Sequence, residues 1–127
     1  MTWVAVLLGG ALGSAARHGV NLITARAFGT PTPYATATVN MIGALAIGVL
    51  AGALAAERVT LTSTERTLLI TGVLGGFTTF SSLVLDSLVL WQSGAIARAV
   101  VNLIGQLVLG SLLVYLGYQL GVRTGGN

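Results

Sequence analysis

A chain of 127 residues in which 54% are hydrophobic and only 7% are charged has too few charges to cover the surface of a soluble domain. Its six basic residues, all arginines, stand singly at the ends of apolar runs, not in the clusters that nucleic-acid binding requires. The chain has no cysteine, so neither disulfides nor thiolate metal sites are expected. From this composition, residues 1–127 are predicted to form a single all-α membrane domain that contacts the lipid bilayer and binds no nucleic acid.

Four stretches have about the 20 residues that a helix needs to cross a bilayer. The first carries Arg17, His18 and Asn21 in its later part, where lipid headgroups can receive them. Its beginning lacks the positive charge of a secretory signal peptide, so it is expected to remain as a membrane helix. The four predicted spans cover residues 3–24, 34–56, 67–91 and 99–121.

The third span is predicted to be broken. Ser63 or Thr64, ahead of Glu65, is expected to cap its start. Glycines and threonines then make an unbroken helix unfavourable, and irregular backbone at membrane depth is tolerated only where protein buries it or a polar cavity adjoins it. A break over residues 75–79 would free carbonyls that can coordinate a cation. The interrupting residues are Gly72, Gly75, Gly76, Thr78 and Thr79.

Several of the 18 glycines lie four residues apart, a spacing that lets helix backbones approach closely in lipid. These glycines are expected to serve packing. A phosphate-binding loop at the first pair is the alternative, but the dinucleotide motif is incomplete there. The pairs are Gly9 with Gly13, Gly48 with Gly52, and Gly117 with Gly121.

The arginines are almost evenly divided between the two sides of the predicted bundle. One side holds Arg58, Arg66 and Arg123, and the other holds Arg26 and Arg98, with Arg17 close to it. Because arginine and lysine bias sets orientation, near equality predicts insertion both ways up. A chain that inserts both ways can form an antiparallel two-fold dimer.

Polar residues at membrane depth are costly unless they have partners, so they are candidates for function. Asn40 in the second span offers amide protons, and residues 71–82 in the third span offer hydroxyl protons and phenyl ring edges. These donors suit a small, strongly hydrated anion. Asp86, toward the end of the third span, is expected to pair with an arginine or meet water. In the alternative interpretation, the hydroxyls simply bond carbonyls of their own helix.

Three segments resemble the Fluc (CrcB) family of fluoride channels. The stretch Gly75-Gly76-Phe77-Thr78-Thr79-Phe80-Ser81-Ser82 is similar to the family's signature. The opening Gly9-Gly10 with Gly13 and Arg17, and the stretch Thr36-Ala37-Thr38-Val39-Asn40-Met41-Ile42-Gly43, resemble two further family patterns.

This resemblance implies a passive fluoride channel in the plasma membrane, built as a dual-topology antiparallel homodimer. It implies one structural sodium ion at the dimer interface, held by the carbonyls of Gly75 and Thr78 of each subunit. It also implies a fluoride pathway with Asn40 as donor, the ring edge of Phe80, and Arg17 near an aqueous vestibule. Thr79, Ser82 and Gln106 complete the expected pathway.

Two positions depart from the family's pattern. Leu83 stands where a second phenylalanine is common, which removes one ring edge, and Gln106 stands where serine is frequent, with Asn102 one turn earlier. A related partner subunit that restores the missing ring is therefore an alternative to the homodimer. Phe80 as an ordinary packing residue is the alternative to its pathway role.

No arrangement of nucleophile and base supports an enzyme. The main alternative function is a small multidrug transporter, which has a similar length and four spans. Such transporters resemble this chain in size but depend on a membrane-embedded glutamate in the first helix, where this chain has none. A purely structural membrane subunit is a third possibility, and it leaves the predicted break without a purpose.

Overall fold

The computed structural model describes residues 2–30 and 32–123, and every regular element in those residues is helical. The predicted all-α class is therefore confirmed. The elements are α1 (Thr2–Phe28), α2 (Tyr34–Ala55), α3 (Ser63–Arg66), η1 (Thr67–Leu74), α4 (Gly75–Phe77), α5 (Phe80–Gln92) and α6 (Ile96–Arg123).

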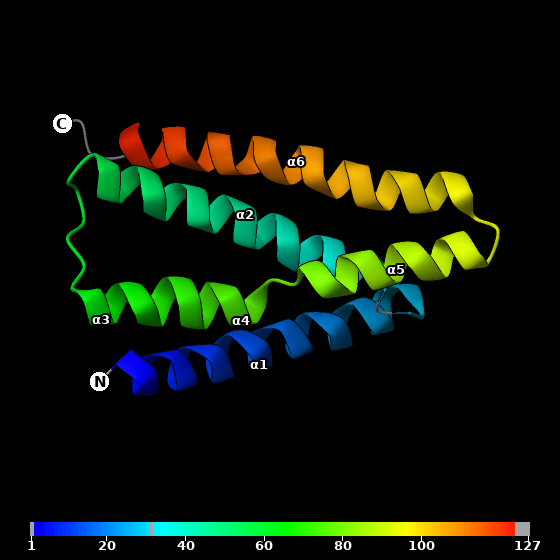
Figure 1. The fold of residues 1–127 in the computed structure, drawn as a ribbon, viewed down its shortest axis with the longest axis horizontal. Coiled ribbons are helices and arrows are strands. Elements are labelled where there is room, and N and C mark those ends of the chain that lie inside the picture. Colours follow the sequence, from blue (N-terminus) through cyan, green and yellow to red (C-terminus); the bar gives the residue numbers. More distant parts are fainter. Residues whose placement is uncertain (1, 31, 124–127) are drawn as a thin grey trace.

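The helices run back and forth along one long axis (Figure 1). Helices α2 and α6 pack side by side along most of their length, while α1 lies against η1 and α4. The start of α1, the α2–α3 connection and the end of α6 lie at one end of the molecule, which we call the terminal end. The α1–α2 and α5–α6 connections lie at the other, which we call the loop end. This is the distribution that four successive spans predict.

Three helical segments are long and apolar enough to cross a membrane: Tyr34–Ala55, Ser63–Gln92 and Ile96–Arg123. They correspond to the second, third and fourth predicted spans. Helix α1 has 27 residues and is long enough, but it is not apolar enough to be one of these three candidate spans. Arg17, His18, Asn21 and Arg26 lower its hydropathy, so a first transmembrane span remains a prediction.

The predicted glycine contacts are confirmed at all three pairs. A Cβ atom added at Gly13 would lie 2.1 Å from the carbonyl oxygen of Val73. One added at Gly52 would lie 2.1 Å from the carbonyl oxygen of Tyr118. Gly9, Gly48, Gly117 and Gly121 meet backbone atoms of a facing helix in the same way. Only hydrogen fits at these positions, which is why the backbones of α1 and η1, and of α2 and α6, can touch.

The third span begins with a capping box one residue earlier than expected. Thr62 accepts a hydrogen bond from the backbone N–H of Glu65, and the Glu65 carboxylate accepts from the backbone N–H of Thr62. The prediction of Ser63 or Thr64 as the cap was therefore wrong, because the reciprocal bond requires the glutamate three residues after the cap. Residues 67–74 then form a π-helix, a rare widened geometry that often accompanies functional sites.

Candidate functional site

The third span is interrupted at two residues. Helix α4 continues through Phe77, and then Thr78 (φ −84°, ψ 164°) and Thr79 (φ −155°, ψ 118°) are extended before α5 begins at Phe80. The Thr79 hydroxyl caps α5 by accepting from the backbone N–H of Ser82 at 3.2 Å. The predicted break is confirmed, but it is shorter than residues 75–79 because both glycines remain helical.

Asn40 of α2 holds the broken backbone. Its Oδ1 accepts from the backbone N–H of Thr79 at 2.9 Å, and its Nδ2 donates to the carbonyl oxygen of the same residue at 3.0 Å. The second Nδ2 proton goes to Oε1 of Gln106 at 3.0 Å. One side chain from another helix thus replaces the acceptor that the break takes from the Thr79 N–H, and it adds a second donor to the Thr79 carbonyl.

The break also changes the partners of two carbonyl groups. In a continued helix, Gly75 O would accept from the N–H of Thr79, and Thr78 O would accept from the N–H of Ser82. Those protons go instead to Oδ1 of Asn40 and to the hydroxyl oxygen of Thr79. The two carbonyls predicted to hold a cation are therefore among those that lose their usual helix donors at the break.

Arg17 of α1 also reaches the region of the break. Its guanidinium donates a hydrogen bond to the carbonyl oxygen of Gly76, and the contact is partly buried. This carbonyl belongs to the last turn before the break, where a positive charge is favourable. The structure thus places Arg17 against the broken helix.

A chain of side-chain hydrogen bonds leads from the break along α6. Gln106 Nε2 donates to Asn102 Oδ1 at 2.9 Å, Asn102 Nδ2 donates to the hydroxyl of Ser87 at 2.9 Å, and Ser87 donates to the carbonyl of Leu83. Asn40 donates to Gln106 at the start of this chain, so each side chain donates to the next one in the direction away from the break. Sequence reasoning missed Ser87, although the four-residue spacing of Asn102 and Gln106 already put two amides on one face of a helix.

The hydroxyls of the signature segment divide into two groups. Thr78 donates to the carbonyl oxygen of Leu74 in its own helix at 3.0 Å, as the packing interpretation expected. Thr79 instead donates to the hydroxyl of Ser82 at 3.0 Å, and its hydroxyl lies 3.4 Å from that of Ser81. Only the second group leaves a hydroxyl proton, that of Ser82, without a protein acceptor among the described residues.

Two hollows open beside Asn40 and Thr78, which line both of them. The first, about 230 Å³, is also lined by Thr79, Phe80, Leu83 and Gln106. The second, about 360 Å³, is also lined by Gly75. Phe80 is 68% exposed, so its ring is not packed into the protein, whereas Leu83 is 3% exposed and forms an apolar wall. The structure therefore gathers most of the predicted anion and cation residues into neighbouring hollows. Ser82 and Arg17 line neither hollow, and they are bonded instead to Thr79 and to the carbonyl of Gly76.

Asp86 is held by a hydroxyl. The Thr36 hydroxyl of α2 donates to its Oδ2 at 2.7 Å, and this bond ties α2 to α5. No ion pair between Asp86 and an arginine is found among the described residues. The sequence left the partner of this carboxylate open, and the fold settles it.

These features define a helical, multi-pass integral membrane protein with a broken helix and a donor-lined hollow beside the break. The family model described as "CrcB-like protein, Camphor Resistance (CrcB)" matches residues 4–118, so the chain belongs to the CrcB family. Membership and the three apolar spans place it in the plasma membrane.

Relatives align along nearly the whole chain. "Fluoride-specific ion channel FluC 2" of Nitrobacter hamburgensis is 42% identical over 120 residues, which are 94% of this chain and 96% of that protein. "Fluoride-specific ion channel FluC" of Chloroflexus aurantiacus is 42% identical over 97% of each chain. The protein of the same name from Paracoccus denitrificans is 46% identical over 94% of each.

Proposed function

We propose that this chain is a fluoride-specific ion channel that lets fluoride leave the cell passively. The observation that carries the proposal is the hollow at the break, where Asn40, Thr79 and Gln106 form one hydrogen-bonded group. The identity of the conducted ion is inferred from the names of the relatives, which are fluoride-specific ion channels. No chemical step is required, because an open path with donors along it is enough for conduction.

Fluoride accepts hydrogen bonds and donates none, so its path must present protons. Gln106 and Ser82 each keep one proton without a protein acceptor among the described residues, and the exposed ring of Phe80 presents an edge of positive partial charge. Both amide protons of Asn40 are bonded, so fluoride binding there requires exchange with an oxygen of Gln106 or Thr79. Groups that replace the hydration shell in this way are the usual basis of selectivity in channels.

The functional unit in this proposal is an antiparallel homodimer of four-span subunits, with α1 as the first span. The near balance of arginines between the two ends supports insertion in both orientations. Phe80 and many other large apolar residues are exposed on the single chain, which leaves apolar surface for lipid and for a second copy. A related partner with an additional ring near Leu83 is the alternative.

A sodium ion between the subunits belongs to the same proposal. Gly75 O and Thr78 O fit a cation because both lose their helix donors, and both residues line one hollow. Two carbonyls are too few for a cation, so a second subunit would supply two more. The ion would fix the two broken helices against each other.

The multidrug-transporter alternative is not favoured. Helix α1 contains no acidic residue, and the relatives are named as fluoride channels. A purely structural subunit would conduct no fluoride at all.

The direct test is fluoride efflux from liposomes that contain only the purified chain. We expect rapid, passive efflux that a fluoride electrode follows, with no coupling to a proton or sodium gradient. Efflux by this chain alone would also exclude an obligatory partner subunit. An intact, reconstituted chain that releases no fluoride would contradict the proposal.

A further inference from the structure

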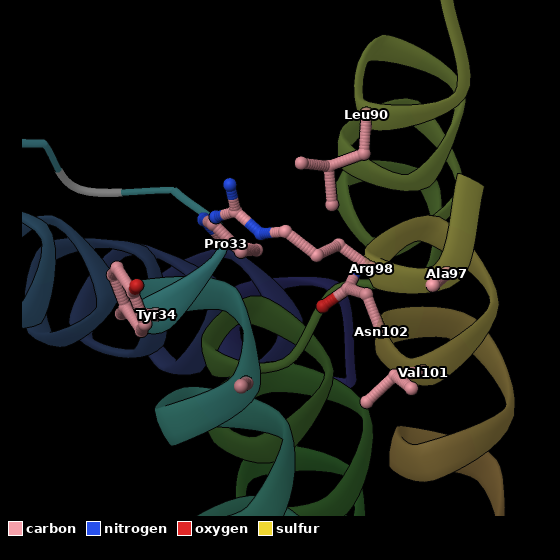
Figure 2. Close-up of a pocket in the computed structure, with 8 residues that line it drawn as sticks. Pro33, Tyr34, Leu90, Ala97, Arg98, Val101 and Asn102 are labelled. Atoms are coloured by element: carbon pink, nitrogen blue, oxygen red, sulfur yellow. The ribbon is translucent and has the colours of Figure 1, made fainter. Parts of the chain in front are cut away.

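A third pocket, separate from the break, opens at the loop end. It has a volume of about 340 Å³ and lies between the first turns of α2 and α6 and the later part of α5 (Figure 2). Its walls are mainly apolar, and no acidic residue lines it. The lining residues are Pro33, Tyr34, Ala37, Leu90, Ala97, Arg98, Val101 and Asn102.

Arg98 is the one charged side chain of this pocket. Figure 2 shows it extending from α6 across the pocket toward Pro33. It is exposed, and it makes no hydrogen bond or ion pair with another residue in the described part of the chain. A guanidinium without a partner at the mouth of this pocket leaves its positive charge available to attract an anion.

The backbone adds to this positive field. Helices α2 and α6 both begin beside the pocket, so the positive ends of both helix dipoles lie near it. The cap residue of α2, Pro33, makes no side-chain cap bond, so no side chain neutralises that end. The charge of Arg98 and the two helix ends favour an anion at the mouth of this pocket.

The pocket is connected to the break by the amide chain. Asn102 lies at its inner side and is bonded to Gln106, which is bonded to Asn40. Arg98, Asn102 and Gln106 follow each other at intervals of four residues, about 6 Å apart along one face of α6. Asn102 and Gln106 each keep one amide proton without a protein acceptor among the described residues.

We propose that the loop-end pocket is an anion-capture site, in which Arg98 binds fluoride before it passes Asn102 and enters the hollow at the break. This inference rests on the proposed function. Arg98 acts by raising the local concentration of the anion, so it governs flux when fluoride is scarce and loses its influence when fluoride is abundant. Because its attraction is electrostatic, its effect also declines as salt rises.

The test compares fluoride efflux, over a range of fluoride concentrations, from uncharged phosphatidylcholine vesicles that contain the wild type or single variants. At low ionic strength, Arg98→Gln is expected to raise the half-saturating fluoride concentration about fivefold while leaving the maximal flux unchanged. Arg98→Lys, which keeps the charge, is expected to restore most of the effect. Raising the salt concentration should bring the wild type and Arg98→Gln together.

Arg26→Gln is the matched control. It removes the same charge at the loop end, but from the last turn of α1 and outside the pocket. It is expected to behave as the wild type. Equal shifts in Arg26→Gln and Arg98→Gln would overturn the inference by showing a general effect of surface charge.

The source of the bound anion is tested by adding anionic phosphatidylglycerol to the vesicles. An effect of Arg98→Gln that is found only in these vesicles would assign the pocket to a lipid phosphate and overturn fluoride capture. A conducting wild type with an unaltered Arg98→Gln variant overturns this inference alone. A wild type that conducts no fluoride overturns the proposed function and this inference with it.

Discussion

At the scale of single residues, Asn40 has a structural role in the fold and, in the proposed channel, a conducting role. Its amide bonds both backbone groups of Thr79 and also donates to Gln106. The sequence predicted a donor at this position from its depth in a charge-free span. It could not predict the bonds to Thr79, because they join residues 39 positions apart in the chain.

Asn40→Asp is expected to reduce fluoride efflux to background. The carboxylate has no protons for Thr79 O and Gln106 Oε1, and its charge repels an anion in the hollow beside it. Liposome efflux measures the loss. Asn21→Asp on α1, outside both hollows, makes the same change and is expected to keep the flux.

The Phe80→Ile substitution distinguishes a packing role of the Phe80 ring from a role in the fluoride pathway. The ring is 68% exposed, so its replacement by another apolar side chain is expected to change the free energy of unfolding by less than about 1 kcal/mol. If the ring edge contacts fluoride, efflux is lost although the protein remains folded. Undiminished efflux in both Asn40→Asp and Phe80→Ile would refute the site assignment.

At the scale of the helices, two features decide how the elements fit together: glycines where backbones touch, and the amide chain that joins α2, α5 and α6. The glycine spacing was visible in the sequence because it repeats every four residues along each helix. The amide chain was only partly visible, since Ser87 and Asn102 come from different helices and their contact depends on how α5 and α6 pack.

Two alanine substitutions on α1 test the close contacts. Gly13→Ala places a Cβ atom 2.1 Å from the Val73 carbonyl oxygen and is expected to destabilise the fold by about 1–3 kcal/mol or more. Gly19→Ala meets nothing within 4 Å and is expected to be neutral or to stabilise the helix by up to about 1 kcal/mol. Thermal unfolding in detergent distinguishes them, and similar unfolding temperatures would contradict the packing role.

Gln106→Leu tests the amide chain. It leaves an amide proton of Asn40 and the Oδ1 of Asn102 without partners, at an expected cost of about 2–3 kcal/mol. Gln119→Leu on the same helix is the control, because Gln119 makes no hydrogen bond with another described side chain in this structure. A variant at residue 106 as stable as this control would show that the chain is not a structural bond network.

At the scale of the whole molecule, the distribution of arginines bears on how the chain sits in the membrane. The two ends carry nearly equal numbers, so neither end is strongly favoured on the cytoplasmic side. Both orientations are needed before two copies can form an antiparallel pair.

Labelling single cysteines tests the orientation directly, because the native chain has none. Thr60→Cys reports the terminal end and Ser93→Cys reports the loop end. In intact cells, a thiol reagent that cannot cross the membrane is expected to label about half of each variant. Complete labelling of one variant and none of the other would show a single orientation and exclude the antiparallel dimer.

The sequence by itself determined the helical class, three apolar spans, the glycine contacts and the presence of a break within residues 75–79. Each depends on composition or on spacing along one helix, and such properties are local. It also identified the family, because the signature segment is contiguous. Its single-domain organisation, first span, dimer and sodium ion stay predictions.

Only the tertiary structure decided the rest. The cap at Thr62, the bond from Thr36 to Asp86, the contact of Arg17 with Gly76 and the open pocket at Arg98 depend on which groups meet in space. In lipid, polar groups at depth are costly unless they find a partner within the protein or line a polar cavity. The partner that it finds is set by the packing of whole helices, which the pattern along the chain does not contain.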